Sequence, residues 1–481
     1  MLYILHKNGL QGKNWRLTKA LNVDLTARVK TKAGLTREIK REKGGKQGGK
    51  LMVPMFAKTM DTLAEDMAEN PNLGIQILSE RIPALLFMDD VLSFSEGYDQ
   101  QMDTLEAIND FGKKHQIEWG AAKCKVLEMG THEEEKKEWN LGDKTIENSD
   151  NYKYLGEIIS RDGKNDANLS ARFKKLKSTV RAINTSGKSH IMQKIEIKLL
   201  ITLHNAVTLP TLLYNSETWP LNSTIRKQID QMEIWAWKSM LGLPKTTPTP
   251  AIIYSTGSIY ASIRVEMKQL IYLHKVLSKG DNNWAKVSLK ALQEHNIGFA
   301  KQIYQILEVW GLNTDWDMIK RKSAREWKRE VLGAAEKRNK DKLKEECHAR
   351  NRGEVKIKTK TKVIVSQLEN PEYTRNPDKI MNCNNKLITR AYIMGRFGML
   401  QCAANFSNGY GGKDCRSCGE IDNESHRINH CNLWDTINLS SSPDKINFEH
   451  IHSINETESM KVVERILLMW DLANGRNCMR T

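Results

Sequence analysis

Two adjacent aspartates, Asp89 and Asp90, are the residues of this sequence best suited to hold a divalent cation. They lie between the apolar runs PALLFM and VLSF, in a segment bounded by Pro83 and Gly97. Two short apolar runs around a polar pair are typical of a β-hairpin, which would place both carboxylates at its tip. Mg²⁺ prefers carboxylate oxygens held on rigid elements. Asp is also a favoured turn residue, so the pair by itself leaves a purely structural role open.

A second group of candidate metal ligands lies near the end of the chain. The stretch CRSCGEIDNESHRINHC sets Cys415, Cys418, His426 and Cys431 in C-x2-C-x7-H-x4-C spacing. Three thiolates and one imidazole can close a tetrahedral zinc site, so the pattern predicts a zinc knuckle. His430 is an alternative imidazole, but the spacing to Cys431 favours His426. The structural alternative is a set of scattered reduced cysteines.

The glycine-rich stretch GGKQGGK, from Gly44 to Lys50, has the spacing of a phosphate-binding loop. A loop of that kind needs Ser or Thr after its lysine to bind Mg²⁺, and here the next residue is Leu51. The preceding REIKREK is also a poor buried strand. We therefore exclude nucleotide hydrolysis at this loop.

The elements expected around the aspartates are a helix on each side of the hairpin. An amphipathic run over residues 51–67 predicts the first, and apolar residues at a spacing of about three over 99–115 predict the second. Further along, KCKVLEMG and NYKYLGEIIS have the pattern of strands that extend the first hairpin or form a second one. Another helix is predicted from Ser223 or Thr224 to Gly242, with Pro244 beyond its end.

Length and composition predict a globular intracellular protein of three or so units. The chain has 481 residues, 40% of them hydrophobic and 27% charged. A membrane span needs roughly 18 consecutive apolar residues, which the sequence lacks, and the opening apolar run is too short for a signal peptide. Eight cysteines, unevenly placed, do not suggest a secreted disulfide framework. We expect no membrane association and a location in the nucleus or cytoplasm.

The net charge of +16 is concentrated in two segments. Residues 7–50 contain thirteen Lys or Arg against three Asp or Glu, and residues 320–362 contain seventeen against seven. Such segments favour a polyanion as partner, because neutralising phosphates releases condensed counterions. Each segment alone is equally compatible with a solvated helix face.

The motifs around the aspartates, taken in order, resemble the polymerase palm of reverse transcriptases from non-LTR (LINE-type) retrotransposons. The FMDD stretch at 87–90 is similar to motif C, and GGKQGGKLMVPMF at 44–56 is similar to motif B, with Gln47 and Gly48 at its Gln-Gly pair. WGAAKCKVLEMG resembles motif D, with Lys123 at its lysine, and NYKYLGEIISRDG resembles the primer-grip hairpin of motif E. Four motifs in the family's order make the resemblance specific.

The resemblance continues beyond the palm. LPTLLYNSETWPL at 209–221 and the helix ending in MLGLPKTTPTP look like the thumb of the same family, and NKLITRAYIMGRFGML precedes the knuckle as it does there. Trp219, Trp235 and Trp237 could stack on bases, but tryptophans at helical spacing more often belong to a core.

The sequence departs from the family at motif A. That motif's aspartate and its Lys-Ala-Phe-Asp stretch should precede motif B, and nothing similar is present; Asp24 and Asp61 lack the context. The opening MLYILHKNGLQGKNW resembles the segment that follows motif A. We therefore expect a C-terminal portion of the family's reverse transcriptase, truncated upstream, without fingers or motif A.

The resemblance implies an α+β protein: a partial palm, a helical thumb, a basic helical connector and a small zinc knuckle. The expected domains are, in order, 1–165 (palm, motifs B to E), 166–250 (thumb), 251–369 (connector), 370–450 (knuckle region) and 451–481 (tail). In the family, Mg²⁺-dependent phosphoryl transfer copies an RNA template onto a primed DNA target from deoxynucleotides.

The roles implied for single residues follow from the same motifs. Asp89 and Asp90 would hold catalytic Mg²⁺, Lys123 would face the leaving pyrophosphate, and Gln47 with Gly48 would contact template or nucleotide. Zn²⁺ would occupy the knuckle. The alternative is a non-catalytic relic of a retrotransposon that only binds nucleic acid.

Overall fold

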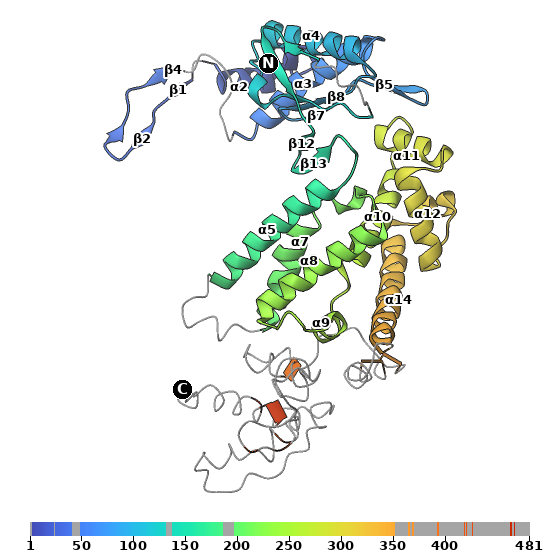
Figure 1. Ribbon diagram of the computed structural model, residues 1–481. Helices are drawn as coiled ribbons and strands as arrows, with labels where there is room; N and C mark the ends of the chain where they lie inside the picture. Colours follow the sequence, from blue (N-terminus) through green and yellow to red (C-terminus); the bar gives the residue numbers. More distant parts are fainter. Residues whose placement is uncertain are drawn as a thin grey trace. The chain divides into compact units, whose positions relative to one another are not determined.

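The computed structural model describes residues 2–23, 25–40, 49–130, 137–185 and 197–351, and the separate positions 364–365, 368–369, 392–393, 418, 420, 426, 462–463 and 466. The chain divides into two compact units (Figure 1). Unit 1 comprises Met1–Lys164 and Gly280–His295, and unit 2 comprises Asn165–Lys279 and Asn296–Thr481. The domain bounds expected from sequence stay predictions, and most of the knuckle region and tail lies outside the described residues.

Two helices form one layer of unit 1. They are α3 (Met52–Glu69) and α4 (Tyr98–His115), and they confirm both helices predicted on either side of the hairpin. Their buried faces carry apolar side chains three or four residues apart, such as Leu63 and Met67 on α3 and Phe111 on α4. These side chains build the main core of the unit.

Short strands cover that layer. They are β5 (Ile75–Ile77), β6 (Glu80–Ile82), β7 (Ala84–Phe87), β8 (Asp90–Ser93), β9 (Lys125–Val126), β10 (Trp139–Leu141), β11 (Lys144–Asn148), β12 (Asn151–Tyr154) and β13 (Glu157–Ser160). β5–β6, β7–β8 and β12–β13 are antiparallel hairpins, while β9 pairs in parallel with β11, which also pairs antiparallel with β10. The NYKYLGEIIS segment thus forms a second hairpin.

The N-terminal part of unit 1 contains two short helices and a β-ribbon. The helices are α1 (Leu2–Lys7) and α2 (Gly12–Ala20). The ribbon consists of β1 (Thr26–Ala27), β2 (Lys30–Thr31), β3 (Gly34–Leu35) and β4 (Ile39–Lys40), with β1 paired to β4 and β2 to β3. Every residue of these four strands is exposed.

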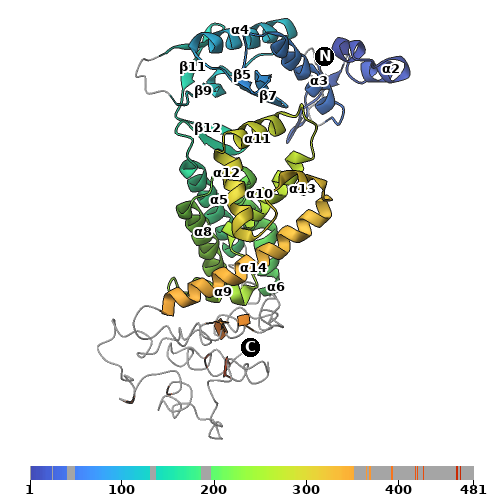
Figure 2. The ribbon, with the colours of Figure 1, turned by 90° about the vertical axis from the view of Figure 1, so that its right-hand side faces the viewer.

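Unit 2 is a bundle of helices around α10 (Ala261–Leu277), as the second view shows (Figure 2). The other helices are α5 (Asp166–Thr185), α6 (Ile197–Leu203), α7 (Leu209–Leu212), α8 (Ser223–Leu241), α9 (Thr249–Thr256), α12 (Gly298–Trp310), α13 (Trp316–Arg321) and α14 (Ala324–Asn351). A π-helical turn, His204–Thr208, joins α6 to α7. The segment between α10 and α12 contains α11 (Trp284–Glu294), which belongs to unit 1.

The prediction for α8 is confirmed at both ends. Asn222 caps it by accepting a hydrogen bond of 2.8 Å from the backbone N–H of Ile225, and Gly242 ends it in the left-handed conformation, with φ of 67°. Trp219 and Trp237 are fully buried, which confirms a core role for these two. Trp235 is half-buried, and its ring packs edge-on against Phe173.

Two acidic residues of α8 stabilise the beginning of α10. One oxygen of Asp230 accepts from the backbone N–H of Ser262 at 2.8 Å, and Glu233 accepts from that of Ala261 at 2.8 Å. The first N–H groups of a helix have no partner within it, so these carboxylates replace a local cap and meet the positive end of the helix dipole. Lys342 of α14 donates to the other oxygen of Asp230 at 2.5 Å. The bundle is therefore held together at α10 by polar contacts as well as by its core.

No helix in the described part of the chain is long and apolar enough to cross a membrane.

Candidate functional site

The β7–β8 hairpin positions the aspartate pair, and its form confirms the sequence prediction. Four residue pairs connect the strands, from Ala84 opposite Ser93 to Phe87 opposite Asp90. Met88 and Asp89 form the two-residue turn. Met88 has φ of 57°, as the first turn residue of a type II′ hairpin turn requires, although glycine usually supplies it. The hairpin therefore holds a non-glycine residue in a strained conformation directly beside the first aspartate.

The strand register decides which side chains of this hairpin face solvent. Alternate side chains point to opposite faces of a strand, and directly paired residues share a face. Ala84, Leu86 and Val91 lie on the face that packs into the core with α3 and α4. Phe87 and its partner Asp90 lie on the other face, where Phe87 is 56% exposed. The hairpin thus presents a carboxylate beside an exposed aromatic ring.

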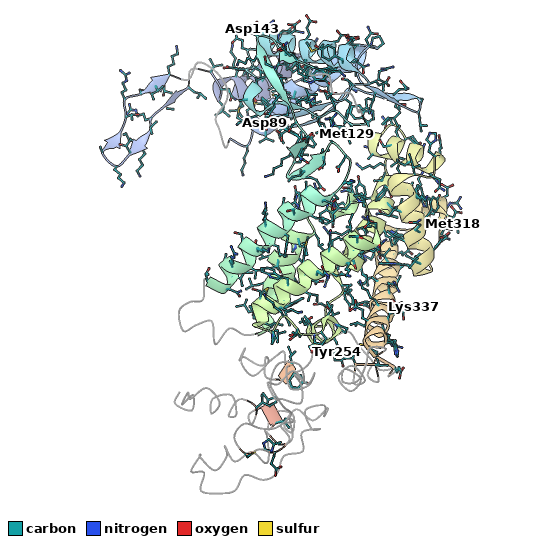
Figure 3. The ribbon with its side chains drawn as sticks, in the orientation of Figure 1. Asp89, Met129, Asp143, Tyr254, Met318 and Lys337 are labelled. Carbon is teal, nitrogen blue, oxygen red and sulfur yellow. The ribbon has the colours of Figure 1, made fainter. Side chains whose placement is uncertain are left out.

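Both aspartate side chains are exposed and have no hydrogen bond or ion pair with another described residue. Asp89 lies at the hairpin tip, while Asp143, the other labelled acid of this unit, lies in the β10–β11 turn (Figure 3). Carboxylates without protein partners keep all their lone pairs for a cation. In the described part of the chain, however, no group of three or more His, Cys, Asp or Glu residues could hold a metal ion.

Two tyrosines of the second hairpin lie near Asp90. Tyr152 and Tyr154 are on β12, two residues apart and therefore on the same face. Partial burial raises the pKa of both phenols, and the negative charge of Asp90 raises the pKa of both further. The turn of this hairpin, Leu155–Gly156, has positive φ at both residues, as in a type I′ turn. The phenols of the segment that resembles motif E thus lie within electrostatic range of Asp90 in the segment that resembles motif C.

Lys123 ends a 3₁₀ turn, Ala121–Lys123, just before β9. Its side chain is exposed and has no ion pair with another described residue. The turn is held in place by Trp119, whose indole N–H donates to the carbonyl of Ile108 on α4 at 2.9 Å. Gly112 makes room for this indole, because a Cβ there would lie 2.4 Å from Trp119 Nε1. The lysine is thus carried on a backbone anchored to α4.

Gln47 and Gly48, the residues expected to contact template or nucleotide, lie outside the described residues. The chain is described again from Gly49, whose carbonyl accepts from the N–H of Met52 at 2.9 Å as α3 begins. The Met52 N–H is therefore used within the chain, and Pro54, two residues further on, has no N–H to offer a ligand.

Of the four proposed zinc ligands, Cys418 and His426 are described, and Cys415 and Cys431 lie outside the described residues. Cys418 Sγ lies 3.2 Å from His426 Nε2, and the imidazole is buried. Two ligands of a tetrahedral zinc with ordinary bond lengths would be separated by about 3.6 Å. The observed pair is therefore close to the spacing that a shared zinc ion would set.

Sequence reasoning did not single out Tyr152, Tyr154 or Phe87 as neighbours of the aspartate site. The alternation of tyrosine in NYKY was a signal for a shared strand face. No local pattern indicated which carboxylate that face would approach, because the approach depends on how two hairpins pack.

A comparison with known families agrees with this geometry. Residues 10–159 match the family model described as reverse transcriptase (RNA-dependent DNA polymerase). The matched stretch runs from just before α2 into β13, so it contains the aspartate hairpin, both flanking helices, Lys123 and the tyrosines. Residues 10–159 of unit 1 are therefore similar to a reverse transcriptase domain, a class that acts on RNA and DNA. This confirms the broad family prediction and a mixed α and β fold.

Proposed function

We propose that this chain derives from the RNA-directed DNA polymerase of a non-LTR (LINE-type) retrotransposon and that Asp89 and Asp90 are its catalytic carboxylates. The observation that carries the proposal is the carboxylate pair at the strained tip of β7–β8, exposed and without an ion pair among the described residues, inside the reverse transcriptase match. The order of the four motifs and the thumb-like segment after them support the non-LTR type.

The side chains fit Mg²⁺, because both carboxylates lack a hydrogen bond or ion pair with any other described residue and sit on a hairpin anchored in the core. Bound Mg²⁺ would supply the positive charge that neutralises the phosphates of an incoming nucleotide. Asp89 and Asp90 would hold the ion, and Lys123 would donate to the leaving pyrophosphate. Gln47 and Gly48 would orient template or nucleotide. Tyr152 and Tyr154, whose phenols feel the charge of Asp90, would bound the site on the side of β12.

We further propose that these 481 residues do not polymerise by themselves. Two-metal transfer needs carboxylates from two motifs to clamp the attacking and leaving oxygens. The sequence contains no segment similar to motif A, and the described residues gather no third acidic or metal-binding side chain beside the aspartate pair. Nucleic-acid binding does not need that third ligand, so binding is expected to persist without synthesis.

Primer extension on an RNA template with Mg²⁺ or Mn²⁺ tests both statements. The samples are the full chain, its Asp89→Ala Asp90→Ala variant, and a fusion that adds a motif A segment upstream of Met1. We expect synthesis only from the fusion, and loss of that synthesis when both aspartates are replaced in it. Extension by the unfused chain above its double variant would show that another carboxylate completes the site. A fusion that stays active without the aspartates would refute their assignment.

A second candidate function, binding of nucleic acid without catalysis, is favoured by the exposed basic residues. On α14 the side chains of Arg325, Arg329 and Lys337 are exposed at intervals of four or eight residues, which places them along one side of the helix. Lys337 projects from α14 into solvent (Figure 3). A salt titration of nucleic-acid binding separates this function from catalysis. The Asp89→Ala Asp90→Ala variant should show the same salt dependence of binding as the unchanged chain.

We propose in addition that Cys415, Cys418, His426 and Cys431 bind one zinc ion. The close approach of Cys418 to the buried His426 supports this. Bound zinc would order a short polar segment that has little core of its own. A protein with these partners would work in the nucleus or the cytoplasm.

A further inference from the structure

The β-ribbon formed by β1 to β4 in unit 1 has two exposed faces. From Thr26 to Lys40 every residue is exposed except Thr36, which is half-buried. An isolated two-stranded hairpin is at best marginally stable in water, since it buries too little apolar surface. A ribbon that keeps this shape without covering either face is suited to bind a partner.

The register of the ribbon separates its side chains by type. Thr26 pairs with Lys40 and Lys30 pairs with Leu35, so Arg28, between them on the same strand, shares their face. The Arg28 guanidinium also reaches Glu38 at 3.4 Å, which places Glu38 on this face as well. This face, called the basic face below, therefore carries three cationic side chains and one acid, together with Thr26 and Leu35.

The opposite face is mostly apolar, although Thr31 also lies on it. It carries Ala27 and its partner Ile39, and also Val29, whose side chain is 55% exposed. This face buries nothing, and no charge complementarity indicates what would cover it. The basic face offers the stronger argument about a partner, because the reverse transcriptase match in the same unit favours a nucleic acid.

A β-bulge adjusts the shape of the ribbon. Between the pairs Ala27–Ile39 and Lys30–Leu35, one strand has two residues and the other has three. Thr36 closes one end of the bulge by exchanging hydrogen bonds with Val29: its N–H donates to the Val29 carbonyl at 3.0 Å, and its hydroxyl accepts from the Val29 N–H at 3.0 Å. Bulges increase local twist, so the ribbon follows a curved surface better than a flat one.

The spacing of the positive charges fits a phosphate backbone. Side chains on one strand face recur about every 6.8 Å, which is twice the roughly 3.4 Å axial spacing of phosphates on one strand of a duplex. Lys40, Arg28 and Lys30 follow one another at this interval along the basic face. A two-stranded ribbon is also of a width that the major groove of B-form DNA admits.

We propose that the β1–β4 ribbon is a nucleic-acid-binding arm, and that Arg28, Lys30 and Lys40 contact the phosphate backbone of a duplex. The arm lies outside the aspartate hairpin and the zinc ligands. It takes the class of its partner from the reverse transcriptase match, but it does not depend on whether the chain polymerises.

The test measures binding of the full chain to a labelled 20-base-pair DNA duplex by fluorescence anisotropy over a range of salt. The variant Arg28→Gln Lys30→Gln Lys40→Gln removes the basic face. Its matched control, Lys227→Gln Lys245→Gln Lys301→Gln, removes the same charge from three exposed lysines of unit 2. An RNA–DNA hybrid and a single strand of the same sequence are the comparison ligands.

The ribbon variant should bind on the order of a hundredfold more weakly at 0.1 M salt, because it loses three phosphate contacts and the counterion release that accompanies each. The slope of log affinity against log salt should fall by about 0.9 for each lost contact. The control should change affinity less than threefold. Conservative exchange, Arg28→Lys Lys30→Arg Lys40→Arg, should restore binding, and Glu38→Gln should strengthen it. The loss should be larger for the duplexes than for the single strand.

Equal losses in the ribbon variant and its control would overturn the proposal, as would unchanged affinity in the ribbon variant. The apolar face provides the remaining outcome. If Val29→Thr Ile39→Thr abolishes self-association in sedimentation while the charge variant binds normally, the ribbon joins two copies of this chain and the arm does not bind nucleic acid. These results leave the aspartate assignment untouched, because primer extension by the motif A fusion tests that separately.

Discussion

Replacing Lys342 by methionine tests whether the carboxylate caps of α10 hold unit 2 together. Lys342 Nζ donates to Asp230 at 2.5 Å and to the Ser262 hydroxyl at 3.2 Å, and it lies 4.3 Å from the centre of the Tyr260 ring. The Asp230 side chain is only 11% exposed. Methionine keeps most of the lysine stem and removes only the charge, so the change isolates the ion pair from the packing.

The expected cost follows from the burial of the carboxylate. Leaving a buried charge without its partner typically costs 3–5 kcal/mol, and about 3 kcal/mol is expected here because Asp230 keeps both bonds from Ser262. Burial already raises the pKa of Asp230, against the attraction of Lys342. Because the pKa of Asp230 is raised in the folded state, its contribution to stability is lost as pH rises through that pKa. Without Lys342 the pKa should rise further, and the protonated carboxyl needs no cationic partner. The cost of Lys342→Met should therefore shrink as pH is lowered from 7 towards 4.

Urea and thermal unfolding of the full chain, followed by tryptophan fluorescence, measure this cost. The midpoint temperature should fall by roughly 6–12 °C at pH 7. Lys344→Met, on the same helix, is the control and should cost less than about 0.5 kcal/mol. Adding Asp230→Asn to Lys342→Met should recover part of the loss. A loss below about 1 kcal/mol at pH 7, or one that does not change with pH, would refute the reasoning.

Three further outcomes are expected. Burial lowers the pKa of His204 below its usual 6.5, so unit 2 should lose stability as pH falls through 6.5. His204→Gln should remove this pH dependence of the unfolding free energy, and identical pH profiles of stability for the variant and the unchanged chain would contradict the prediction. Gly74→Ala should destabilise the aspartate hairpin by roughly 2 kcal/mol or more, because φ is 87° and a Cβ would lie 2.5 Å from Pro83 Cα. The control Gly333→Ala, in open space on α14, should be neutral or stabilising. If Gly74→Ala and Gly333→Ala had the same effect on stability, the close approach to Pro83 would be relieved by a small shift of the backbone. Native mass spectrometry should find one zinc per chain and none in Cys418→Ser; zinc retained by that variant would exclude the proposed ligand set.

The elements that could be predicted from sequence are those whose signals are local. The helix α8 carries an Asn cap and a Gly stop at its own ends, and β7–β8 has apolar runs that alternate around a polar pair. The hairpin β5–β6 was not foreseen, because its turn contains Leu78 at φ of 53°, where an Asn-Gly or Gly signal would be expected. Tertiary packing selects that turn.

The part of the site that sequence could not predict depends on contacts between distant segments. Asp230 and Glu233 look like ordinary solvated residues of an amphipathic helix, yet they cap a helix about thirty positions later. The connector also looked like one charged helical region. In the structure it contains α10, which is buried along most of its length, and α11, which belongs to unit 1. The order of elements along the chain does not reveal which unit a helix joins, because its burial depends on the elements that pack against it in the folded protein.

The two long edges of the β1–β4 ribbon have a consequence for handling the protein. Each strand of a two-stranded sheet has an outer row of backbone N–H and C=O groups that another extended chain can join. Lysines along the edge and the bulge next to Thr36 oppose such joining by charge and by twist. Variants that replace these lysines with neutral residues should therefore form soluble aggregates more readily at high concentration. Light scattering should accompany every purification of them, and arginine is the safer replacement.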